Sequence, residues 1–209
     1  MIRHLITWKN VHVADVELPH TQDWACDIFF RSIALRNELK VSHIRELNNT
    51  LFTNLAGGFS QNIVDELSNV LLQYLHEFYG KNYRREDITV VTSFSLGYFP
   101  ETSHRDIGPH DHRAVHFTIV FYANFVPHEG DLKIWNPWSW DGDGIIYEPK
   151  NLRALIMPGN VPHNMMPHQN TQPRVCVVTQ FKVANMPLFG APCGRFMDEQ
   201  NHDGLIERY

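Results

Sequence analysis

The spacing of the hydrophobic residues changes along the chain and divides it into a helical part and a strand-rich part. Apolar side chains recur at three- and four-residue steps over 23–39 and, more clearly, over 60–80, which predicts two amphipathic helices. Ser60 can cap the second helix, and Gly80 lies where a left-handed residue often ends a helix. Residues 1–86 are therefore predicted to be mainly helical.

The region 87–183 instead contains short β-branched and aromatic runs separated by Gly, Pro, Asn and Asp. These runs are ITVVTSFSLGYF, VHFTIVFYANF, DLKIWN, GIIYEP, RALIMP and RVCVVTQFKV. Short strands at this spacing are typical of an antiparallel sandwich or barrel. We expect a single mainly β domain, with 1–86 as helical support, 87–183 as the β-core and 184–209 as an irregular tail.

The composition narrows the class of protein. With 18 basic and 23 acidic residues the net charge is −5, which gives no electrostatic reason to expect a nucleic acid or an anionic membrane as partner. Hydrophobic content of 43% fits a globular chain, and no apolar run is long enough to span a membrane. Three scattered cysteines without paired spacing favour a reduced, cytoplasmic protein.

Histidine is the unusual component, because the chain has 13 His against 12 Gly, and histidine is the commonest metal ligand. His104 and Asp106 form a His-x-Asp pair, whose side chains would share one face of a strand. His163 ends a later apolar run, and Arg174 opens the next one. Two imidazoles and one carboxylate suit Fe(II) with open positions, and a buried arginine requires an anion such as a dicarboxylate.

This ordered set resembles the Fe(II)- and 2-oxoglutarate-dependent oxygenases, most closely the prolyl 4-hydroxylase-like and phage-type branch. The matching features are Gly97, His104-Arg105-Asp106, the run HFTIVFYAN, Gly130-Asp131-Leu132, RALIMPGNVPH ending in His163, and Arg174. They extend over about half the chain. The resemblance implies a double-stranded β-helix, or jelly roll, packed by the N-terminal helices. It also implies Fe(II), 2-oxoglutarate and O2 as cofactor and co-substrates.

The resemblance further implies roles for individual residues. His104, Asp106 and His163 would be the catalytic iron ligands. Arg174 would bind the distal carboxylate of 2-oxoglutarate, with Tyr122 as a hydroxyl contact and Thr118 as a weaker candidate on the same strand face. The family has a second tyrosine upstream of the His-x-Asp pair, where this chain offers Phe94.

A second ligand cluster follows six residues later, in His110-Asp111-His112. Some relatives use a His-x-His in a similar place, and because loop lengths vary, the distance to the next strand does not choose between the two. Gly97, seven residues before His104, favours the earlier pair. His110, His112 and Arg113 would then lie at the mouth of the site and contact substrate.

The segment 135–144 places three tryptophans beside acidic and glycine residues. Trp138 and Trp140 either line a substrate pocket or pack on the sheet edge, and packing is favoured for Trp135.

Three functions remain open at this point. The leading one is an oxygenase that hydroxylates an unactivated carbon of an amino acid, a peptide or a small natural-product intermediate. The second is a cupin-like metalloenzyme without 2-oxoglutarate, which would use His104, His110, His112 and His163. The third is a non-catalytic jelly-roll module that binds metal.

Overall fold

We analysed a computed structural model of the chain, which describes residues 1–39, 59–98, 109–139, 144–166 and 171–189. The predicted sites His104, Asp106 and Trp140, and most of the predicted tail 184–209, lie outside these described residues. Within them, no helix combines the length and apolar character needed to cross a membrane.

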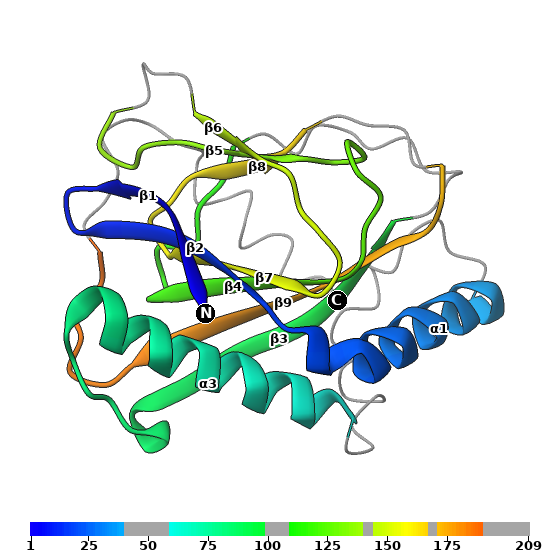
Figure 1. Cartoon of the computed structure of the whole chain (residues 1–209), viewed down its shortest axis with the longest axis horizontal. Coiled ribbons are helices and arrows are strands. Elements are labelled where there is room, and N and C mark those ends of the chain that lie inside the picture. Colours follow the sequence, from blue (N-terminus) through cyan, green and yellow to red (C-terminus); the bar gives the residue numbers. More distant parts are fainter. Residues whose placement is uncertain (40–58, 99–108, 140–143, 167–170, 190–209) are drawn as a thin grey trace.

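Two antiparallel sheets form the body of the protein (Figure 1). The larger has six strands in the order β1-β2-β7-β4-β9-β3, and the smaller has three in the order β6-β5-β8. The strands of the larger sheet are β1 (Ile2–Trp8), β2 (Val11–Glu17), β3 (Ile88–Tyr98), β4 (Phe117–Asn124), β7 (Arg153–Pro158) and β9 (Arg174–Val183). Those of the smaller sheet are β5 (Leu132–Ile134), β6 (Ile145–Tyr147) and β8 (His163–Met165). This arrangement confirms the predicted jelly roll with helical support.

The two helices cover the outer face of the larger sheet, on the side away from the smaller sheet (Figure 1). They are α1 (Gln22–Leu39) and α3 (Phe59–Tyr79), close to the two predicted ranges, and short 3-10 turns precede α1 (Pro19–Thr21) and β3 (Arg85–Asp87). The buried stripe of α3, which includes Leu67, Leu71 and Tyr74, packs on outward-facing residues such as Ile119 and Phe121 of β4. This outer core is formed mainly by apolar side chains and accounts for the helical periodicity of the sequence.

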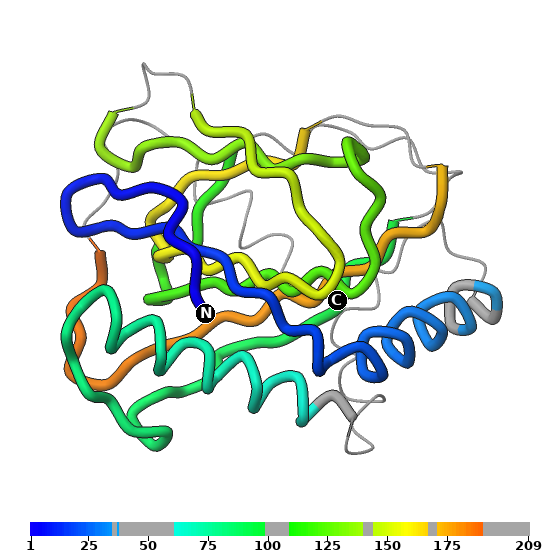
Figure 2. The backbone as a smooth tube through the Cα atoms, in the orientation of Figure 1, coloured from blue at the N-terminus to red at the C-terminus, as the bar shows by residue number. Residues whose placement is uncertain are grey.

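The chain opens with a β-hairpin that the hydrophobic pattern did not predict. β1 and β2 pair with each other, and β2 adds to β7, which brings residues 14–17 beside residues 153–156 (Figure 2). Asp15 occupies an inward-facing position of β2, so a charge stands where alternation calls for an apolar residue. The helical support is thus confined to the two helices, and residues 2–17 extend the sheet.

The inner face of the larger sheet faces the smaller sheet and carries the polar residues. On β4, Val120 and Tyr122 belong to this inner core, whereas the alternate residues belong to the outer core. Both faces of β4 are covered, which explains why FTIVFYAN reads as a continuous apolar run. Side chains of the same parity on β9, Arg174, Cys176 and Gln180, lie on this inner face with them.

Candidate metal and anion site

Three histidines converge inside the jelly roll. His110, His112 and His163 each offer one ring nitrogen, and these atoms lie within 4.8 Å of one another. The ring centroids of His110 and His163 are 4.5 Å apart, and that of His112 is 5.2 Å from each. His163 is buried and the other two are half-buried. This spacing fits three imidazoles around one metal ion.

The backbone holds two of these residues side by side. His110 and His163 form an isolated antiparallel bridge, with N–H to carbonyl distances of 3.0 and 2.9 Å in the two directions. The His112 amide donates to the carbonyl of Gly159 at 2.7 Å. A Cβ on residue 159 would lie 2.1 Å from the Val115 carbonyl oxygen, so only glycine allows this close approach. The two ligand segments are therefore joined before any metal arrives.

The ring of His163 is oriented by the backbone as well. Its Nδ1 lies 2.9 Å from the carbonyl oxygen of Val161, an acceptor, so Nδ1 carries the proton. That tautomer leaves the lone pair on Nε2, as in metal-binding histidines whose other nitrogen donates to a carbonyl.

The carboxylate between the two other histidines is engaged elsewhere. Asp111 accepts hydrogen bonds from Nε and Nη2 of Arg113, both at 3.0 Å. No carboxylate joins the three-histidine group among the described residues. The donor set suits a first-row metal such as iron or zinc, and it differs from the two-histidine, one-carboxylate set that the sequence predicted. His104 and Asp106 stay predicted ligands outside the described residues.

Arg174 provides the anion-binding candidate. It is buried, and its Nη1 donates to the carbonyl oxygens of Glu129 at 3.1 Å and Gly130 at 3.4 Å. Its guanidinium lies over the rings of Tyr98 and Phe125, at 4.8 and 5.1 Å from the centroids. Within the described part of the chain no carboxylate pairs with it, and its Nε has no hydrogen-bond partner. A buried cation in this state is suited to an external anion.

Hydroxyl groups lie along the same inner face. Tyr122 is opposite Cys176 on β9, two residues from Arg174. Burial raises the pKa of Tyr122 well above its ordinary value, so this hydroxyl stays a hydrogen-bond donor. Thr118 is opposite Gln180, and its buried hydroxyl has no partner among the described residues. Both predicted co-substrate contacts thus face the interior.

Tyr98 is a site residue that the sequence did not single out. The resemblance drew attention to Phe94, four residues earlier, but Tyr98 is the register partner of Arg174 and carries its guanidinium. The sequence shows Tyr98 only as a tyrosine at the end of a predicted strand. The pairing of β3 with β9 is what places Tyr98, and not Phe94, opposite Arg174.

The smaller sheet relates the anion site to the histidines. The Gly130 carbonyl contacts Arg174, and Ile134, four residues further on, pairs with His163. Four strand residues span roughly 13 Å. A short dicarboxylate, with the reach of the arginine and the imidazoles added, can bridge such a span.

The tryptophan segment is only partly described. Trp138 is half-buried against the inner core, with the Lys9 ammonium 5.1 Å from its ring centroid. Its indole N–H is buried without a partner among the described residues. Trp135 lies under the Lys133 ammonium at 5.2 Å. The substrate roles predicted for Trp138, His110, His112 and Arg113 stay predictions.

Comparison with known proteins places the fold. No family model matches the sequence, and no curated protein matches it. AviO1 from Streptomyces viridochromogenes Tue57 has a TM-score of 0.59 at 12% identity, covering 86% of this chain and 92% of its own. A prolyl-4-hydroxylase from Pseudomonas putida has a TM-score of 0.52 at 15% identity, covering 83% and 88%.

An oxidoreductase of the 2OG-Fe(II) oxygenase family from Burkholderia pseudomallei has a TM-score of 0.47 at 12% identity. That alignment covers 63% of this chain and 62% of the Burkholderia chain. The solved structures that resemble this chain therefore include prolyl 4-hydroxylases and a member of the 2OG-Fe(II) oxygenase family. At these identities the likeness establishes a shared jelly-roll fold, and function has to be argued from the site.

Proposed function

We propose that this protein is an Fe(II)- and 2-oxoglutarate-dependent oxygenase. The observation that carries the proposal is Arg174, a buried arginine without a carboxylate partner in the described chain, inside the same jelly roll as a three-histidine group. A structural arginine at this depth would be expected to have its counter-ion in the fold. An external dicarboxylate held between the arginine and the metal supplies that counter-ion.

We assign the metal to His110, His112 and His163. Iron with 2-oxoglutarate and O2 supplies the oxidation of an unactivated carbon–hydrogen bond, with the co-substrate converted to succinate and CO2. The chain's own residues orient the reactants. Three neutral imidazoles leave the full positive charge on the ion, which favours an anionic co-substrate. Arg174 fixes the far carboxylate, and the Tyr122 hydroxyl can donate to it.

The proposed substrate is an amino acid, a peptide or a small natural-product intermediate. The support is the charge of −5, which gives no attraction for a polyanion such as nucleic acid. Trp138, whose buried N–H has no partner among the described residues, is the aromatic candidate for contact with that substrate.

The test is an anaerobic titration of the protein with Fe(II) and then 2-oxoglutarate. Chelation of iron by the keto acid gives a metal-to-ligand charge-transfer band, which we expect in the wild-type protein. His112→Ala should lose metal binding, measured with Co(II), whereas Asp106→Ala should retain it. Loss with Asp106→Ala and retention with His112→Ala would instead support the ligand pair predicted from the sequence.

A cupin-like metalloenzyme without 2-oxoglutarate is the second candidate, and the all-histidine donor set favours it. In that case iron would bind and no charge-transfer band would follow the addition of 2-oxoglutarate. A protein that binds zinc but turns over no substrate would point to the non-catalytic module. A succinate-release screen over amino acids and peptides then identifies the substrate class.

A further inference from the structure

His112 is held differently from the other two histidines of the cluster. His110 and His163 are tied by their backbone bridge, and the ring of His163 is oriented by a backbone carbonyl. The Nδ1 of His112 instead lies 3.1 Å from Nε2, the side-chain amide nitrogen of Gln180. The orientation of the His112 ring therefore depends on Gln180, a side chain of the larger sheet.

Gln180 is well placed to orient that ring. It lies on β9, paired with Thr118 of β4 in the centre of the six-stranded sheet. Its neighbour Thr179 points to the opposite face and bonds Ser93 at 2.8 Å. The position of Gln180 is thus fixed by two flanking strands.

The chemistry of the imidazole decides which end of the amide faces it. A glutamine amide offers an oxygen acceptor and a nitrogen donor in nearly equivalent positions. In the structure the amide nitrogen faces Nδ1, and donation from it would leave the His112 proton on Nε2, which could not then bind a metal. A half-turn of the amide places its oxygen against Nδ1 instead; the oxygen then accepts from Nδ1–H and leaves a lone pair on Nε2, as a metal ligand requires.

We propose that Gln180 is a positioning residue: its side-chain oxygen accepts the Nδ1 proton of His112 and so fixes the ring as the third metal ligand. The inference rests on the metal centre of the proposed function. Through this contact a bound metal would link the two sheets, because His163 belongs to the smaller sheet and pairs with His110, whereas His112 contacts Gln180 of the larger sheet.

Two substitutions separate an accepting from a donating role. Gln180→Leu removes the contact and is expected to weaken Co(II) binding 10- to 100-fold, the usual effect of losing such a partner. Gln180→Glu retains an acceptor without a donor and should bind Co(II) at least as tightly as wild type. Thr179→Val is the matched control, because it removes a side-chain hydrogen bond from the same strand on the other face.

The tautomer is measured directly in the metal-free wild-type protein by two-bond ¹⁵N–¹H correlation of the histidine rings. The proposal predicts the Nδ1–H form for His112, and an Nε2–H form would overturn it. Equal Co(II) affinity for wild type and Gln180→Leu would also overturn it, as would an equal loss in the Leu and Glu variants. If wild type binds no Co(II), the metal centre itself fails, and with it the proposed function.

Discussion

Two arginines of the inner face lie near Tyr122 and differ in how their charge is balanced. Arg153 on β7 is the register partner of Tyr122 on β4. On the other side of β4, Tyr122 pairs with Cys176 of β9, and Arg174 lies two residues before Cys176. Arg153 bonds the Asp15 carboxylate at 3.0 Å and Glu17 at 3.4 Å. Arg174 contacts backbone carbonyls, aromatic rings and the Cys176 thiol, and no carboxylate among the described residues.

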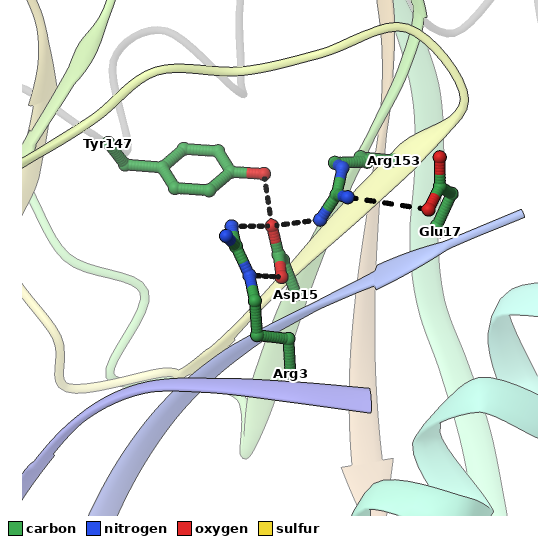
Figure 3. Close-up of polar contacts among 5 residues, drawn as sticks. All are labelled: Arg3, Asp15, Glu17, Tyr147 and Arg153. Atoms are coloured by element: carbon green, nitrogen blue, oxygen red, sulfur yellow. Dashed lines mark hydrogen bonds and ion pairs between the residues drawn. The ribbon is translucent and has the colours of Figure 1, made fainter. Parts of the chain in front are cut away.

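The Arg153 cluster is complete by itself (Figure 3). The Asp15 carboxylate also accepts two bonds from Arg3, at 2.8 and 2.7 Å, and one from the Tyr147 hydroxyl at 3.2 Å. Both oxygens of this buried carboxylate accept bonds from residues on strands of the fold. The contrast indicates that Arg153 stabilises the fold, whereas Arg174 is available to bind an anion from outside the chain.

The largest effect should come from breaking the complete cluster. Asp15→Asn keeps the shape but leaves Arg153 and Arg3 without their shared charge, so the free energy of unfolding should fall by about 3 kcal/mol. Urea unfolding measures the loss. Glu17→Gln, at a side chain that is 63% exposed, is the control and should cost less than about 1 kcal/mol. Equal losses in the two variants would contradict the assigned importance of Asp15.

The next effect sharpens the role of Arg174. Arg174→Ala should weaken 2-oxoglutarate binding roughly 100-fold, because a desolvated charged contact is worth about 2–5 kcal/mol, while Co(II) binding stays unchanged. Arg174→Lys should also be impaired, since an ammonium does not reproduce the planar fork. Isothermal titration gives both affinities.

Arg153→Lys is the matched control for the co-substrate experiment. It should lower stability and leave 2-oxoglutarate affinity within about twofold of wild type. If both arginine substitutions weakened co-substrate binding alike, the distinction between a structural and an anion-binding arginine would fall.

The smallest effect concerns pH. Burial lowers the pKa of His116 from its ordinary 6.5, and its Nδ1 accepts the Val183 amide at 3.0 Å. As the pH falls through 6.5, the unfolded chain takes up this proton first, so stability present above 6.5 is lost towards the lowered pKa. His116→Gln should show a shallower loss between about pH 7 and pH 5, by less than about 1 kcal/mol. A slope identical to wild type would contradict this role.

The elements that local patterns define were predictable. The stripe of α3 shows a helical period, and β4 and β9 are nearly continuous apolar runs because both of their faces are buried. The hairpin was not predictable, since Asp15 interrupts its alternation and the partner that compensates it, Arg153, is 138 residues away. A charge compensated over such a distance leaves no local signal.

The site shows the same division. Arg174 could be singled out because a charge opens an apolar run, and His163 because it closes one. The sequence offered His110 and His112 as an alternative to His104 and Asp106, and the spacing did not choose between them. Their grouping with His163 depends on a backbone bridge between distant segments. Gln180 was hidden inside an ordinary strand pattern, since its function depends on which ring lies beside it.

The bridge between His110 and His163 also affects how readily the protein takes up metal. It closes a loop of about 50 residues, and the chain loses the entropy of that closure when it folds. Metal binding then has only a few side-chain rotations left to restrict. We therefore expect the metal-free protein to stay folded and to bind a metal ion without first refolding. The supply of metal, and not refolding, would then set the rate of activation.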